Sequence, residues 1–193
     1  MELHETSERI ERAEEAHHHE RKRAALLIIV LAVGLAIIET GSKEAQFSSI
    51  ALNIQSSDIY AFYQAKTIRG SVLRTAVESA DALFSDAVQQ SAAQKQIAVW
   101  KSEIDRMDSD PSTREGRKEL LERAKSLETQ RDVEERSYHQ FEYAAAGMQL
   151  AIVMASAAVI TEVGVLEAIS AGLGVAAVAL AMLGWLAPTV LRL

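Results

Sequence analysis

The sequence has no cysteine and only two prolines in 193 residues. The lack of cysteine excludes a disulfide-stabilised scaffold and any metal or iron–sulfur site with thiolate ligands. The scarcity of proline, with Ala, Glu, Gln, Arg and Leu in abundance, argues against a β-rich fold and favours long helices. An excess of positive charge is also absent, because 20 Lys and Arg stand against 27 Asp and Glu. A nucleic-acid-binding function is therefore not expected.

Three stretches contain no charged residue, namely residues 24–38, 144–160 and 168–191. A helix needs roughly 20 mostly apolar residues to cross a bilayer core of about 30 Å. The third stretch is long enough, and the aromatic residues before 144 lengthen the second. The sequence therefore predicts an all-α integral membrane protein, with transmembrane helices over residues 24–41, 142–161 and 166–191.

The basic cluster Arg21, Lys22 and Arg23 precedes the first apolar stretch and is expected to anchor it at the lipid headgroups. By the positive-inside rule, residues 1–23 form a charged cytoplasmic leader helix. A cleaved signal peptide is the competing interpretation, but the cluster follows a charged leader and no small-x-small cleavage site is evident before residues 39–43. We therefore expect an uncleaved anchor with a cytoplasmic amino terminus.

The last two predicted spans carry small residues at four-residue spacing. Such spacing lets helix backbones approach closely in a membrane, which favours packing within the chain or between copies. Alanine-rich spans also produce this spacing by chance. The residues concerned are Gly147, Ala151 and Ala155 in one span and Ala168, Gly172 and Ala176 in the other.

Glu162 and Glu167 lie around the turn that joins these two spans. Carboxylates within a membrane can relay protons or bind ions. The spans contain no basic partner for them, so we favour the interpretation that both residues mark the turn.

Residues 42–141 are predicted to form an extramembrane helical hairpin or coiled coil. Between residues 43 and 107 there is no proline and one glycine, Gly70. Small or apolar residues recur in alternating four- and three-residue steps, interrupted by Asp58, which is the pattern of a heptad seam. The seam consists of Phe47, Ala51, Ile54, Ala61, Ala65, Ile68, Val72 and Ala76.

The chain is expected to reverse near residues 108–112. Asp110 has the character of a helix N-cap, and Pro111 suits the first position of a second helix that returns to the membrane. As straight helices, the outgoing segment of about 65 residues would reach roughly 100 Å and the returning one only roughly 45 Å. We therefore expect the outgoing segment to bend near Gly70 or residues 89–96.

Motifs of catalysis are absent from the sequence. It has no glycine-rich phosphate loop, no nucleophile elbow and no paired histidines of the metalloprotease type. His139, with Glu135 and Glu142 on the same predicted helix face, has the spacing for three metal ligands, but polar residues are also common where a helix meets the membrane. We expect no enzyme, no cofactor and no bound metal.

The most distinctive element covers residues 58–69, where aromatic or large apolar side chains go round much of a helix. It resembles the signature Asp-x-x-x-x-Tyr-Gln-Ala-Lys-x-Ile of an uncharacterised bacterial membrane family, the domain of unknown function 4337 family. Tyr60 and Phe62 stand where that family commonly has Trp and Tyr. The resemblance implies a first span, a helical region, two closing spans and a bacterial inner membrane, but no activity. The matching residues are Asp58, Tyr63, Gln64, Ala65, Lys66 and Ile68.

These residues of the signature are candidates for an interaction surface, although aromatic residues at helical spacing are more often core packing. We expect a non-enzymatic scaffold or accessory subunit of the inner membrane. Its partners would be the lipid bilayer and either further copies of the chain or other membrane-protein subunits. The alternative is a transporter or channel component with a pore built from the carboxyl-terminal helical hairpin, and a signalling adaptor is a third hypothesis.

Overall fold

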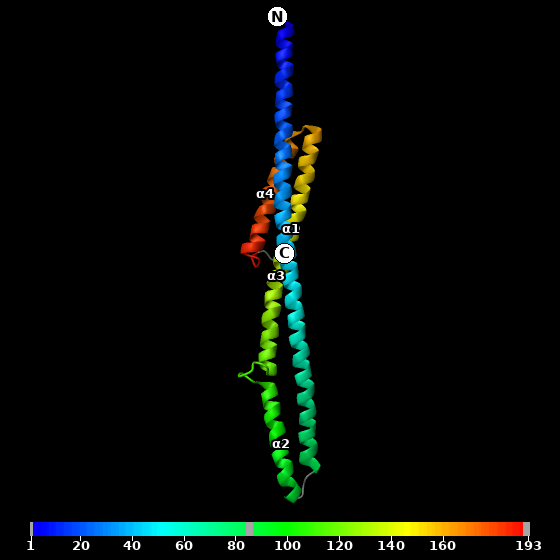
Figure 1. Cartoon of the computed structure of the whole chain (residues 1–193), viewed down its shortest axis with the longest axis vertical. Coiled ribbons are helices and arrows are strands. Elements are labelled where there is room, and N and C mark those ends of the chain that lie inside the picture. Colours follow the sequence, from blue (N-terminus) through cyan, green and yellow to red (C-terminus); the bar gives the residue numbers. More distant parts are fainter. Residues whose placement is uncertain (1, 84–86, 191–193) are drawn as a thin grey trace. The chain divides into compact units, whose positions relative to one another are not determined.

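The computed structural model describes the backbone of residues 2–83 and 87–190 and the side chains of residues 22–83 and 93–190. In these residues the chain forms α1 (Glu2–Leu83), α2 (Ala87–Asp108), α3 (Arg117–Thr161) and α4 (Gly164–Leu186) (Figure 1). All regular structure described is helical, which confirms the all-α prediction. By length and composition, α1, α3 and α4 are able to cross a membrane.

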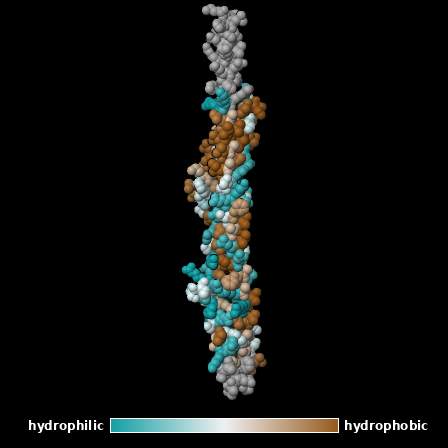
Figure 2. Space-filling model, viewed as in Figure 1, coloured by the Kyte–Doolittle hydropathy of each residue, from teal (hydrophilic) through white to brown (hydrophobic). Residues whose placement is uncertain are grey.

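The chain divides into two compact units. We call the first, Met1–Ser48 with Val133–Leu193, the bundle, and the second, Ser49–Asp132, the hairpin. Helices α1 and α3 contribute residues to both. Hydrophobic residues gather on the bundle helices, whereas hydrophilic and hydrophobic residues are mixed over the hairpin (Figure 2).

The core of the bundle forms where α1, α3 and α4 pack together. Met148 of α3 is 1% exposed and is the largest fully buried side chain among those that the structure describes. Two glycines permit the close approach, because a Cβ on Gly174 would lie 2.4 Å from Cδ2 of Leu31, and one on Gly34 would lie 3.1 Å from Cε of Met148. The other buried members of this core are Ile38, Ala45, Phe141, Ala144, Ala151, Ala155, Ala177 and Ala181.

Two buried hydroxyl groups join α3 to α4. Ser170 Oγ donates a hydrogen bond of 2.7 Å to the carbonyl oxygen of Ala151, and Ser137 Oγ donates one of 3.0 Å to that of Gly184. Both serines are buried, so these bonds remove the cost of placing a hydroxyl in an apolar interior.

The turn between α3 and α4 is short. Glu162 adopts a left-handed φ of 57°, and its N–H closes α3 on the carbonyl oxygen of Ala158 at 2.9 Å. At the far end, α4 stops at Leu186, before the predicted limit of 191. Pro188 accounts for this difference, because proline has no N–H and commonly follows a helix end.

The hairpin places the reversal of the chain between the end of α1 at Leu83 and the start of α2 at Ala87. Helix α2 then runs antiparallel to α1, as the pairs Lys101 with Asp81 (3.8 Å) and Arg74 with Asp108 (3.1 Å) show. The first part of α3 continues along α1, where Ser56 Oγ donates to the carbonyl oxygen of Ala124 at 3.5 Å. The predicted reversal near 108–112 is therefore wrong.

Helix α1 is continuous through Gly70, and residues 89–96 lie within α2. The expected bend is observed at neither place, because the lengths of the two arms agree without it. The outgoing arm ends at Leu83, earlier than expected, and the returning arm is α2 followed by α3. The core of the hairpin comprises Val77, Ala80, Ile97 and Ile104, with Leu73, Ala93 and Trp100 packed against them.

Candidate functional site

Helix α1 carries apolar residues on two opposite faces within the hairpin. One face packs on α2 and α3 and includes the buried Ser56 and Val77 and the half-buried Tyr63. Because successive residues of a helix are about 100° apart, the predicted heptad seam falls on the opposite face. The internal contacts of the hairpin therefore use a different stripe from the one that the heptad pattern identifies.

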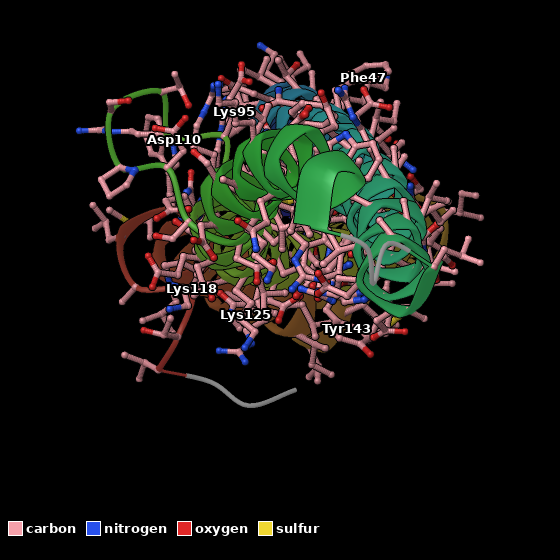
Figure 3. All side chains as sticks on the ribbon, turned by 90° about the horizontal axis from the view of Figure 1, so that it is seen from below. Phe47, Lys95, Asp110, Lys118, Lys125 and Tyr143 are labelled. Atoms are coloured by element: carbon pink, nitrogen blue, oxygen red, sulfur yellow. The ribbon has the colours of Figure 1, made fainter. Side chains whose placement is uncertain are left out.

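The heptad seam is exposed throughout the hairpin as far as Val72. Ile54 is 56% exposed, Ile68 is 66% exposed and Val72 is 62% exposed. Phe47, which belongs to the bundle, points outward and is 69% exposed (Figure 3). Large apolar side chains at heptad spacing normally insert into a facing helix, which the described chain does not provide here. The exposed members within the hairpin also include Ala51, Ala61 and Ala65, whereas Ala76 is half-buried.

The signature element at residues 58–69 is divided between the two faces of α1. Tyr60, Tyr63 and Lys66 are half-buried, which supports a packing role for these three. The pKa of Tyr60 is raised, by partial burial first and then by the nearby carboxylate of Glu128. The remaining candidates, Asp58, Phe62, Gln64 and Ile68, are exposed.

Lys66 connects this element to the loop between α2 and α3. Its ammonium group donates to the backbone carbonyl oxygen of Glu115 and lies 3.8 Å from the Glu115 carboxylate. The same ammonium lies 4.9 Å from the centre of the Phe62 ring, within the range of a cation–π contact. The lysine of the signature thus holds the loop between α2 and α3, which lies where the sequence predicts a reversal of the chain.

Further ion pairs fix the two ends of that loop. Asp108, the last residue of α2, contacts Arg74 of α1 at 3.1 Å and Arg117 of α3 at 2.6 Å. Arg69 of α1 also pairs with Glu103 of α2. These contacts were not anticipated, because the pairing of α1 with α2 depends on a reversal that the sequence does not mark.

Hydrogen bonds to two carboxylates give the loop its internal structure. Ser109 Oγ donates to Glu119 at 2.6 Å, and this bond, the largest of several causes, lowers the Glu119 pKa. Ser112 Oγ donates to Asp110 at 2.5 Å, and this bond, followed by those from Thr113, lowers the Asp110 pKa to about 2. Asp110 therefore caps a turn within the loop, and α3 begins at Arg117 instead of at Pro111.

The loop also requires glycine at position 116. A Cβ there would lie 2.4 Å from the backbone nitrogen of Asp110 and 2.6 Å from Cα of Ser109. Seen along the helices, the loop with Asp110 stands away from α2 and α3 (Figure 3). Beside it, a pocket of about 370 Å3 is lined by Lys66, Arg69 and Arg106 together with Glu103 and Glu115. Lys66 and Arg69 are paired with Glu115 and Glu103 respectively, so the pocket is primarily structural.

The small-residue stripes of the last two predicted spans differ in their burial. In α3, Ala151 and Ala155 are 0% exposed and pack in the bundle core, and a Cβ on Gly147 would lie 3.6 Å from Cβ of Ala177. In α4, the residues buried in the bundle are Ser170, Gly174, Ala177, Ala181 and Gly184. The predicted stripe of α4 lies on its exposed face, so packing between copies stays a prediction for Ala168, Gly172 and Ala176.

The remaining candidates lie apart from one another. Lys22 and Arg23 are exposed, while the side chain of Arg21 and those of the rest of the leader fall outside the described residues. Nδ1 of His139 lies 3.4 Å from the Glu142 carboxylate. In the side chains described, no group of three His, Asp or Glu residues is arranged to hold a metal ion.

A comparison with known families gives a match that covers nearly all of the chain. A family model described as Domain of unknown function (DUF4337) matches residues 5–187. No curated protein and no solved structure matches the chain. The family resemblance carried by residues 58–69 is thereby confirmed.

Proposed function

The chain belongs to the family of domain of unknown function 4337, and from this premise, which brings no activity, we propose that it is a non-enzymatic integral membrane scaffold or accessory subunit. The three long apolar helices support insertion into a membrane. The basic cluster at residues 21–23 supports a cytoplasmic amino terminus, and the bacterial inner membrane is the location that the family implies.

The exposed heptad seam of α1 carries this proposal. Between Ala51 and Val72 the stripe covers about 30 Å of helix. Its large members Ile54, Ile68 and Val72 are each more than half exposed. Full burial of such a side chain contributes about 1.5–3 kcal/mol, so a facing helix would gain substantially by covering the seam. The hairpin then acts as a docking helix that assembles copies of the chain or joins it to another membrane subunit.

Asp58 determines which partner the seam prefers. It occupies a seam position and is exposed. Two parallel copies in register would bring two Asp58 carboxylates together, which is unfavourable because like charges repel. A partner helix with Lys or Arg opposite Asp58 avoids this cost, so Asp58 favours the accessory-subunit arrangement.

The size of the complex in mild detergent tests the proposal. The full chain is extracted from its own membrane, and its mass and co-purifying chains are determined for the native protein and for an Ile54→Ser/Ile68→Ser variant. A Gln55→Ser/Ser71→Ala variant is the matched control, because Gln55 and Ser71 are exposed on the same helix but outside the seam. We expect the native chain and the control to migrate in a larger complex and the seam variant to be released from it. A native chain that is monomeric, or a seam variant that stays bound, would contradict the proposal.

The transporter or channel alternative has one supporting observation, which is that Glu167 lines an open groove in the bundle. A pore gated by Glu162 or Glu167 predicts flux in liposomes that changes in Glu162→Gln and Glu167→Gln variants. Absent or unchanged flux would argue against it.

A further inference from the structure

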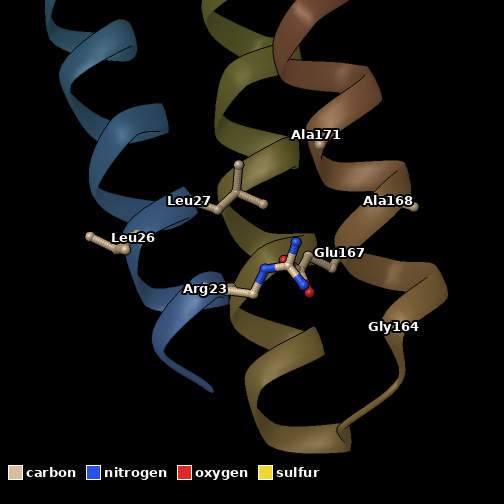
Figure 4. Close-up of a pocket in the computed structure, with 7 residues that line it drawn as sticks. All are labelled: Arg23, Leu26, Leu27, Gly164, Glu167, Ala168 and Ala171. Carbon is tan, nitrogen blue, oxygen red and sulfur yellow. The ribbon is translucent and has the colours of Figure 1, made fainter. Parts of the chain in front are cut away.

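An open groove of about 540 Å3 lies in the bundle between the start of the apolar part of α1 and the start of α4. Its apolar lining consists of Leu26 and Leu27 from α1 and Ala168 and Ala171 from α4. Arg23 and Glu167 stand at the same groove, and Figure 4 shows their side chains extending toward each other across it. One cation, one anion and an apolar wall thus share a single site.

Among the side chains that the structure describes, neither of these two charges is paired with the other or with a neighbour. Neither Arg23 nor Glu167 forms an ion pair within 4.0 Å with another residue whose side chain is described. Arg23 is exposed and Glu167 is half-buried. A molecule that brings both an anionic and a cationic group into the groove would pair with both residues.

We propose that this groove binds a zwitterionic phospholipid whose headgroup carries a primary ammonium group, as phosphatidylethanolamine does. The phosphate accepts hydrogen bonds from the guanidinium of Arg23, and the ammonium donates to the carboxylate of Glu167. The first part of an acyl chain lies along Leu26, Leu27 and Ala171. The inference rests on the proposed membrane insertion but not on the proposed docking role of the heptad seam.

The chemistry of the groove distinguishes this lipid from the other common classes. Phosphatidylglycerol supplies the phosphate but no cation, which leaves Glu167 beside a second negative charge. Phosphatidylcholine supplies a quaternary ammonium, which has no N–H to donate to a carboxylate. Only a headgroup with both a phosphate and a primary ammonium makes charge-assisted hydrogen bonds to both residues.

Position in the chain agrees with the same occupant. Arg23 directly precedes the uncharged residues 24–38, and Glu167 lies in the first turn of α4. Both are therefore placed where an apolar helix begins, which is the level of lipid headgroups for a membrane-spanning segment. Annular lipids touch any membrane protein, but they do not show a preference for one headgroup over another of equal charge.

Native mass spectrometry of the delipidated full chain in mild detergent tests the site. Phosphatidylethanolamine, phosphatidylcholine and phosphatidylglycerol with identical acyl chains are added in equal amounts, and the bound lipids are counted. We expect phosphatidylethanolamine to be retained about tenfold over the other two, as one charge-assisted hydrogen bond allows. Equal retention of the three, or a preference for phosphatidylglycerol, would overturn the proposal without any variant being made.

Variants locate the binding. Glu167→Gln is expected to abolish the preference for phosphatidylethanolamine over phosphatidylcholine, while Arg23→Gln weakens the retention of both. Lys22→Gln and Glu39→Gln are the matched controls, since Lys22 is exposed, Glu39 is half-buried and neither lines the groove, and they are expected to leave the preference unchanged. An equal loss with Lys22→Gln would show that the basic cluster acts as a whole and would overturn the assignment to Arg23.

A separate measurement distinguishes failure of the proposed membrane insertion from failure of the lipid site. If the chain leaves the membrane on washing with alkaline carbonate, both the membrane proposal and the lipid site are wrong. If it stays in the membrane but shows no headgroup preference, only the lipid site is wrong.

Discussion

The bundle and the hairpin are both built from antiparallel helices, yet they are stabilised in different ways. The bundle relies on close approach, with Ala144, Ala151 and Ala155 at 0% exposure and with glycine where Leu31 meets α4. The hairpin has a small apolar core and adds ion pairs such as Arg74 with Asp108 and Lys66 with Glu115. Small side chains suit a membrane, where burial of apolar surface contributes little, and ion pairs suit water.

The comparison also shows what each unit leaves uncovered. The exposed apolar residues of the bundle, such as Val33 and Val153, suit a lipid environment. The exposed apolar residues of the hairpin, such as Ile54 and Ile68, follow a heptad repeat, and lipid has no preference for such a repeat. This difference is the reason for assigning a helical partner to the hairpin.

The largest expected effect of a single substitution is in the bundle core. Met148→Ala removes the largest fully buried side chain and should lower the free energy of unfolding by about 2–5 kcal/mol. Leu150→Ala, on the same helix at 53% exposure, should change it by less than about 1 kcal/mol. Thermal unfolding of both variants in detergent compares them, and equal destabilisation would refute the assigned packing of α3.

A pair of glycine substitutions probes the hairpin. Gly116→Ala forces a Cβ against the backbone of Ser109 and Asp110 and should destabilise the hairpin by about 1–3 kcal/mol. Gly70→Ala adds a Cβ where no atom lies within 4 Å, so it should stabilise α1 by about 0.5–1 kcal/mol. The fluorescence of Trp100 follows unfolding of the hairpin once Trp185 is replaced by Phe. The same sign of change in both variants would show that the loop does not have the described conformation.

Asp58→Leu tests whether the apolar residues of the hairpin seam face a partner helix. Removing the charge from the seam should strengthen association between copies by about tenfold, or about 1.4 kcal/mol. Ser71→Leu adds the same side chain to an exposed position about 140° away from Asp58 around the helix and should have little effect. Analytical ultracentrifugation in detergent measures both. Equal effects would mean that general hydrophobicity, and not the seam, drives association.

The smallest predicted effect is a dependence of hairpin stability on pH. The folded pKa of Asp110 is about 2, below its ordinary value of 3.8, and the Glu119 pKa is lowered as well. A group with a lowered folded pKa stabilises the folded state above its unfolded pKa and loses that contribution as the pH falls through the folded value. The hairpin should therefore become less stable between about pH 4 and pH 2. Asp110→Asn should flatten this dependence in Trp100 fluorescence, and an unchanged slope would contradict the assigned hydrogen bonds.

Much of the fold follows from hydrophobic pattern alone. The three apolar stretches predict the helices of the bundle. Ile97, Trp100, Ile104 and Met107 recur at the spacing of one helix face and form the inner face of α2, where Trp100 is half-buried and the others are buried. Both signals arise from long runs with a single period, which local sequence describes well.

The position of the reversal could not be predicted, because residues 84–86 contain no glycine or proline, whereas residues 108–111 contain strong turn formers. Tertiary pairing between α1 and α2 determines the outcome. The packed face of α4 was also missed, since small residues occur on both of its faces and only the contacts with α1 and α3 select Gly174 over Gly172. The inward role of Lys66 depends on the loop and has no signal in α1 itself.

A cysteine scan of α1 from residue 51 to residue 72 tests the central claim most directly, because the chain contains no native cysteine. Each single-cysteine variant is cross-linked in its own membrane, and the yield of intermolecular product is plotted against position. If the seam docks on a partner helix, the yield rises and falls with the heptad, with maxima at Ala51, Ile54, Ala61, Ala65, Ile68 and Val72 and low yield at Ser71. A flat profile, or maxima on the inner face at Ser56 and Tyr63, would contradict the claim.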